Sequence, residues 1–123
     1  MAKTFESLRV WHDARRLCTH VYALVRSKHF GRDLGLADQL RRSAVFVMSN
    51  IAEGFERGGR AEFARFLIIA KGSLAELRSQ LYVAEDAAYA SAALASELRQ
   101  QSVILSRRID ALVNRIRGRQ PSS

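Results

Sequence analysis

Proline is absent from the chain until position 121, and this absence constrains the fold more than any other feature of the sequence. Proline removes a backbone hydrogen-bond donor and clashes with the preceding turn, so a long proline-free stretch can form unbroken helices. The glycines that would interrupt such a stretch gather mainly at 31–35 and 54–59. The chain has 123 residues, of which 48% are hydrophobic, and this fits one globular domain. Together these features predict a small all-α protein.

Apolar residues recur at steps of three and four through four segments, which is the spacing of one helical face. We therefore predict four helices, over about residues 5–27, 36–56, 60–88 and 91–117. In the last of them Leu98, Leu105 and Leu112 lie seven apart, and this spacing favours packing at small crossing angles. The connections are short. They predict an antiparallel, up-down-up-down four-helix bundle over residues 1–118, followed by a flexible tail at 119–123.

Two polar residues stand where predicted helices begin. Thr4 precedes the first apolar stripe and Ser91 precedes the fourth, and hydroxyl side chains at such positions bond the free amides of the first turn. No alternation of apolar and polar residues bounded by turn residues occurs, so no strand is predicted.

The charge is strongly basic. Twenty lysines and arginines against twelve acidic residues give a formal charge of +8, and seventeen of the twenty are arginine. The guanidinium group suits phosphate, so a nucleic acid is one expected partner. Nine arginines are the candidate nucleic-acid-binding residues: Arg41, Arg57, Arg60, Arg65, Arg99, Arg107, Arg108, Arg115 and Arg117. The alternative is that they form solvated helix faces, with arginine standing where a less GC-rich genome would encode lysine.

Seven further positions on the second and third predicted helices lie at or beside core spacing although most are polar. They are Gln39, Arg42, Asn50, Glu53, Gly54, Ser73 and Glu76. A carboxylate at such a position is costly to bury unless an arginine or a hydrogen-bond donor meets it. We predict a buried, structural polar network, which fixes helix register or forms a subunit interface. Paired carboxylates for acid–base catalysis and a plain solvated face are the alternatives.

Signals for catalysis or cofactor binding are weak. The two histidines of the first predicted helix are eight residues apart, too far to share a metal ion, and the Glu-x-x-His pattern of di-iron bundles is missing. A single cysteine, Cys18, excludes an internal disulfide and any zinc site built on several thiolates. No apolar run reaches membrane-spanning length, and residues 1–16 lack a signal-peptide core. We expect a cytoplasmic protein without enzymatic activity, metal, cofactor or membrane contact.

Three segments carry a family resemblance: Gly35 to Ser43, Asn50-Ile-Ala-Glu-Gly-Phe55 and Gly72-Ser-Leu-Ala-Glu-Leu77, the last within a longer match from Glu62. They resemble the bacterial four-helix-bundle proteins encoded within intervening sequences of large-subunit ribosomal RNA genes. The accessory variability protein of diversity-generating retroelements is similar. The resemblance covers nearly the whole chain, from Phe5 to about Ile116.

The resemblance implies a barrel-shaped homopentamer with a basic surface, which in the retroelement branch binds nucleic acid and a reverse transcriptase. It implies no catalytic activity. Asn50, Glu53, Gly54, Ser73 and Glu76 fall on the polar motif positions of the family. Phe46 and Met48 depart from it, because the family usually has serine and proline there.

Three functions follow as hypotheses. The first is a homo-oligomeric nucleic-acid-binding or scaffold protein that associates with RNA or DNA. The second is a protein-interaction module that recruits a partner such as a reverse transcriptase, with charge serving orientation. The third is an enzyme or metal protein whose site the sequence does not reveal.

Overall fold

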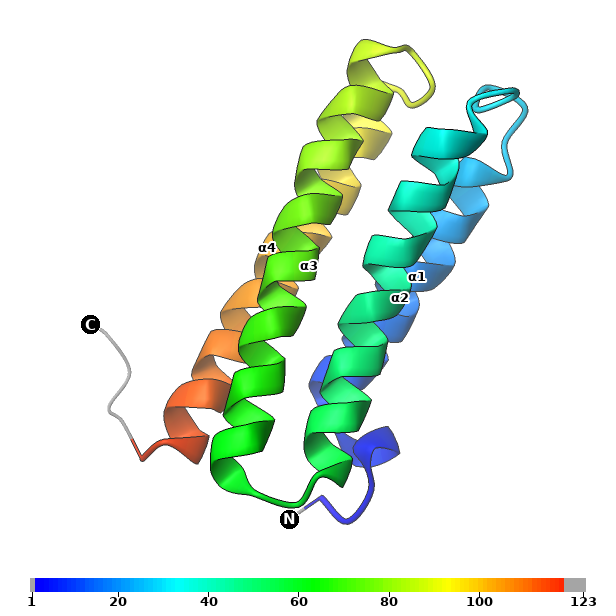
Figure 1. Cartoon of the computed structure of the whole chain (residues 1–123). Helices are drawn as coiled ribbons and strands as arrows, with labels where there is room; N and C mark the ends of the chain where they lie inside the picture. Colours follow the sequence, from blue (N-terminus) through cyan, green and yellow to red (C-terminus); the bar gives the residue numbers. More distant parts are fainter. Residues whose placement is uncertain (1, 119–123) are drawn as a thin grey trace.

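The computed structural model describes residues 2–118, and these residues form a bundle of four long helices (Figure 1). A short 3-10 helix, η1 (Phe5–Ser7), precedes them. The helices are α1 (Arg9–Val25), α2 (Leu34–Glu56), α3 (Arg60–Asp86) and α4 (Ala92–Ile116). Each helix runs antiparallel to the next, and α4 returns to lie beside α1. The described residues contain no strand, so the prediction of an all-α four-helix bundle is confirmed.

The first helix begins later than the spacing predicted. The predicted start at residue 5 is wrong for the α-helix, because η1 is followed by Leu8 in extended conformation and α1 begins at Arg9. The ring of Phe5 lies edge-on to Trp11 with centroids 5.2 Å apart, which folds the N-terminal turn back onto α1. Thr4 caps no backbone amide, since its hydroxyl lies 3.1 Å from the Ser7 hydroxyl instead. The predicted tail at 119–123 lies outside the described residues.

The other helix ends follow from local chemistry. The Ser91 side chain accepts a hydrogen bond from the Leu94 amide at 3.1 Å, as predicted, and Asp33 caps α2 in the same way. Gly58, between α2 and α3, has φ +82°, a backbone conformation that residues other than glycine rarely adopt. Ala88 has φ +64°, which ends α3 at Asp86, two residues before the predicted boundary.

The core runs along the bundle axis and is almost entirely aliphatic. Its fully buried side chains include Leu40, Ile51, Leu67, Leu74, Leu77, Leu81, Leu98, Leu105 and Ile109. Ser102 adds a polar side chain to this core: it is 0% exposed, and its hydroxyl donates to the Leu74 carbonyl and accepts from Arg78. Among the described residues, no helix has both the length and the apolar content that crossing a membrane requires.

Removing the Asp33 cap is expected to destabilise the protein. Its carboxylate accepts from the Leu36 amide at 3.1 Å and from the Tyr89 hydroxyl at 3.1 Å, so it joins the two loops at one end of the bundle. Asp33→Ala should lower the free energy of unfolding by about 0.5–2 kcal/mol in a urea titration, the usual range for a lost cap. Asp33→Asn, which keeps a capping oxygen, should stay within a few tenths of the wild type. Equal losses in the two variants would contradict this role.

Candidate nucleic-acid interface

The seven residues predicted as a polar network line α2 and α3, but they do not form a buried network within the chain. Gln39, Arg42, Glu53 and Glu76 are exposed. The Asn50 side chain donates to the Phe46 carbonyl of its own helix at 2.8 Å, and Ser73 is buried. The prediction of a buried network is therefore wrong for a single chain. The helical periodicity places most of these side chains on the outer side of the α2–α3 pair, where water reaches them. The interface alternative stays a prediction.

The outer side of α2 and α3 is a mixed surface. Gln39 and Glu76 line one hollow of about 580 Å³ between the two helices. Phe46, Ile69 and Val83 are 50%, 41% and 51% exposed, although such side chains usually contribute to a core. Phe46 is also one of the two departures from the family pattern. We call this surface, with Asn50, Glu53 and Ser73, the α2–α3 face.

Gly54 allows α2 and α3 to pack closely at Phe66. A Cβ atom at this position would lie 2.5 Å from the Phe66 Cβ, far inside van der Waals contact. The glycine therefore has a packing role, and it lies in the last turn of α2 without ending the helix.

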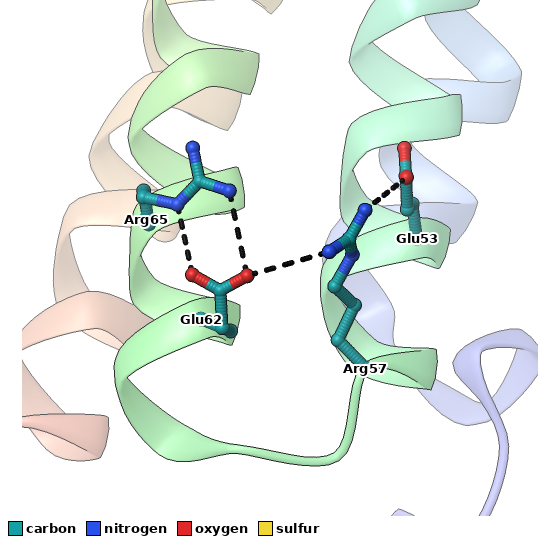
Figure 2. A network of polar contacts seen from close by, with 4 residues as sticks. All are labelled: Glu53, Arg57, Glu62 and Arg65. Carbon is teal, nitrogen blue, oxygen red and sulfur yellow. Dashed lines mark hydrogen bonds and ion pairs between the residues drawn. The ribbon is translucent and has the colours of Figure 1, made fainter.

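Four charged residues form a ladder across the turn between α2 and α3 (Figure 2). Arg57 bonds Glu53 at 3.0 Å and lies 3.6 Å from Glu62, whose carboxylate also accepts from Arg65 at 2.9 Å. The hydrogen bond from Arg65 lowers the pKa of the Glu62 carboxyl, and the charges of Arg65 and Arg57 add to this effect. Both guanidinium groups also lie over the ring of Phe66, at 5.0 and 4.8 Å. The carboxylates of this ladder thus neutralise much of the charge of Arg57 and Arg65, two of the predicted nucleic-acid-binding arginines.

Most of the other predicted arginines are also engaged. Arg41 pairs with Asp38 at 3.3 Å, and Arg60 donates to the Ile116 carbonyl at 2.6 Å, which fixes the end of α4. Arg99 bonds Glu85 at 2.8 Å and lies 3.9 Å from the centroid of the Tyr82 ring. Arg60 and Arg99 thus link α3 to α4, whereas the Arg41 pair lies within α2; the charges of Arg41 and Arg99 are partly neutralised.

Arg107, Arg115 and Arg117 differ, because they are exposed and form no ion pair to another described residue. Arg108 is half-buried and bonds Asp13 of α1 at 2.7 Å. The nine predicted arginines therefore fall into three groups. Five have an acidic partner (Arg41, Arg57, Arg65, Arg99 and Arg108), Arg60 bonds a backbone carbonyl, and Arg107, Arg115 and Arg117 have neither among the described residues.

The structure adds two arginines that the sequence analysis missed. Asp13 meets Arg108 on one side and Arg16 of its own helix, at 3.8 Å, on the other. Arg16 is 67% exposed, and Arg9, seven residues earlier, shares its side of α1. The signal in the sequence was the seven-residue spacing on the outer side of the first helix. We call Arg9, Arg16, Arg107, Arg108 and Arg115 the α1–α4 strip.

The α1–α4 strip carries a strong excess of positive charge. Its five arginines meet one carboxylate, Asp13, whose side chain is only 11% exposed. Arg16 and Arg108 line a shared hollow of about 320 Å³ together with Ile104. The two helices lie side by side behind α2 and α3 in Figure 1. This arrangement can attract an anion with several charges, such as a phosphate backbone.

The described side chains that could bind a metal ion or act in catalysis do not gather in one site. Among residues 2–118, no three His, Cys, Asp or Glu side chains lie close enough to hold a metal ion. A hollow of about 920 Å³ lies between α1 and α4 at the end opposite to η1, and His20 there contacts Gln101 at 3.0 Å. Cys18 is buried, and burial raises the pKa of its thiol, which disfavours the reactive thiolate.

Comparisons with known proteins are consistent with this architecture. The family described as 23S rRNA-intervening sequence protein matches residues 6–111. A crystal structure from Bacteroides thetaiotaomicron VPI-5482, described as a protein with unknown function from the S23 ribosomal protein family, superposes with a TM-score of 0.76. It is 17% identical, and the match covers 85% of this chain and 97% of that one, which shows a shared fold. No curated protein matches this chain.

Proposed function

This chain belongs to the 23S rRNA-intervening sequence protein family, and from that premise we propose that it is a non-catalytic, basic, homo-oligomeric protein that binds nucleic acid. RNA is the first partner to consider, because the description of the family refers to an intervening sequence in 23S rRNA. A cytoplasmic location is part of the proposal and fits a single reduced cysteine.

The α1–α4 strip is the observation that carries the proposal. A net charge of +8 alone is compatible with ordinary solubility. Arg57 and Arg65 of the α2–α3 turn pair with Glu53 and Glu62, whereas Arg9, Arg107 and Arg115 have no described acidic partner and lie on two adjacent helices. Cations that have no internal partner are the ones available to a polyanion.

The homo-oligomer is supported by the α2–α3 face. Phe46, Ile69 and Val83 keep much of their apolar surface in water in a single chain, and burying it against another copy would be favourable. The predicted interface residues Gln39, Asn50, Glu53, Ser73 and Glu76 surround them. The resemblance makes five the expected number of copies. A pentamer would combine five cationic strips in one particle and so raise the attraction to nucleic acid.

Binding to a fluorescently labelled RNA, followed by anisotropy over a salt series, tests the proposal. We expect tight binding at low salt that weakens by about 100-fold between 50 and 200 mM salt, which corresponds to the release of counterions from about four phosphates. Native mass spectrometry of the same sample should show a single oligomer. Negligible binding at low salt would refute nucleic-acid binding, and a monomer would refute assembly. A protein partner recovered after nuclease treatment, without RNA binding, would favour the recruitment of a protein such as a reverse transcriptase.

A further inference from the structure

We infer that the α1–α4 strip binds the phosphate backbone of a double-stranded nucleic acid and does not read bases. This inference rests on the proposed function and specifies the class of nucleic acid at that site. Three features of the strip carry it: the arrangement of its arginines in two rows, the lack of an available aromatic ring beside them, and the carboxylate that lies between two of them.

The arginines form two rows on adjacent helices. Arg9 and Arg16 are seven residues apart on α1, and Arg108 and Arg115 are seven apart on α4. A helix rises about 1.5 Å per residue, so each row spans about 10.5 Å. The contacts of Asp13 with both Arg16 and Arg108 fix the rows side by side, and packed helix axes lie about 8–10 Å apart. The result is a two-dimensional array of cations.

A two-dimensional array suits a duplex better than a single strand. A duplex presents phosphates from two strands, separated by a groove of about 6–12 Å in B-form DNA, whereas a single strand presents one line of phosphates. One row of the strip can therefore contact each strand across a groove. Arg107 is exposed as well and precedes Arg108 on α4, about 100° around the helix from this row.

The strip lacks the rings that hold single strands. Proteins that bind single-stranded nucleic acid place aromatic side chains between their basic residues, so that bases stack on them. α4 contains no aromatic residue. On α1 the His12 ring is near the row, but it packs edge-on against Trp11 and contacts the Glu6 carbonyl at 2.6 Å. Tyr82 is exposed but belongs to α3, where Arg99 already lies over its ring.

Asp13 orients the centre of the array. Its two carboxylate oxygens meet different guanidinium groups, Arg108 at 2.7 Å and Arg16 at 3.8 Å, and its side chain is mostly buried. The carboxylate hydrogen-bonds Arg108 and so restrains it, attracts the more exposed Arg16, and cancels only one of the two charges. Arg108 is thus oriented before binding, which reduces the entropy that its side chain loses on contact with phosphate.

The test compares three labelled probes on the full-length protein: a 20-bp RNA duplex, a 20-bp DNA duplex and single-stranded oligo-U of 20 nucleotides. We expect the duplexes to bind at least about tenfold more tightly than oligo-U at the same salt, with little dependence on duplex sequence. The double variant Arg9→Gln/Arg115→Gln should weaken duplex binding by about tenfold or more and reduce the salt slope by about two.

The matched control is Arg26→Gln/Arg32→Gln. These arginines are also exposed and have no described ion pair, but they lie at the opposite end of α1 and in the loop after it. The control removes the same amount of charge but at a distance from the strip. If the strip is the site, the control should therefore reduce the salt slope by less than about half a unit. Circular dichroism and native mass spectrometry should show both variants folded and assembled as the wild type.

Each other outcome has a distinct meaning. Oligo-U binding as tightly as the duplexes would overturn the duplex inference and leave the proposed function intact. Equal loss in the strip variant and the control would show that overall charge governs binding, and would overturn the site. Poly-glutamate competing as well as unlabelled duplex would replace nucleic acid with acidic polypeptide as the partner. No binding of any probe at low salt would refute the proposed function itself.

Discussion

Alanine at position 54 is expected to destabilise the protein by about 1–3 kcal/mol, the usual range for overpacking a closely packed contact. In an isolated helix the same substitution would be favourable, because glycine is worse than alanine in a helix by about 1 kcal/mol. Here the new Cβ would lie 2.5 Å from the Phe66 Cβ. Neither atom can rotate away, since a Cβ position is fixed by its backbone. The helices α2 and α3 must therefore separate, and neighbouring core contacts loosen.

Gly72→Ala is the matched control for this prediction. Gly72 lies within α3, and an added Cβ there meets no atom within 4 Å. We expect it to stabilise the protein by about 0.5–1 kcal/mol through helix propensity. Urea titrations of the two variants should thus give changes of opposite sign. A Gly54→Ala variant that gains stability as Gly72→Ala does would mean that α2 and α3 approach each other less closely than described.

The fold was largely predictable because the helices are long and regular. The periodicity of α3, from Phe63 to Ala84, needs no tertiary information to be recognised. The errors lie where tertiary contacts override local pattern. The Phe5–Trp11 contact separates η1 from α1, and the predicted single helix is therefore wrong at its start. Local sequence does not reveal an aromatic pair that folds a terminal turn back.

The candidate site was less predictable, because the availability of a charge depends on its partners. Arg57 and Arg115 are indistinguishable as residue types. The first belongs to a ladder with Glu53 and Glu62, whereas the second has no described acidic partner. Within one helix such pairs can be expected from the spacing of three or four residues. The contact of Asp13 with Arg108 joins residues 95 positions apart, and only the packed structure reveals it.

A comparable limit applies to the residues that the resemblance selected. Asn50, Ser73 and Glu76 share a pattern, and polar residues beside a core stripe suggested a buried network. The structure places Glu76 on the surface and binds the Asn50 side chain to its own helix. The helical pattern does not distinguish a position that faces the core from one rotated by a few tens of degrees toward the surface.

A similar rotation of heptad positions around α4 leads to the last prediction. We expect Leu105→Ala to be among the most damaging single substitutions in this helix. Leu98 and Leu105 are 1% and 2% exposed, but Leu112, the third leucine of the heptad series, is only half-buried. A straight helix drifts by about 20° per heptad, so the third leucine moves off the core direction and Ile109 and Val113 replace it. Leu105→Ala should lower the free energy of unfolding by about 2–5 kcal/mol, and Leu112→Ala by about half of that or less, because less of its surface is buried. Urea titration of both variants measures the difference, and equal losses would mean that α4 supercoils and keeps all three leucines in the core.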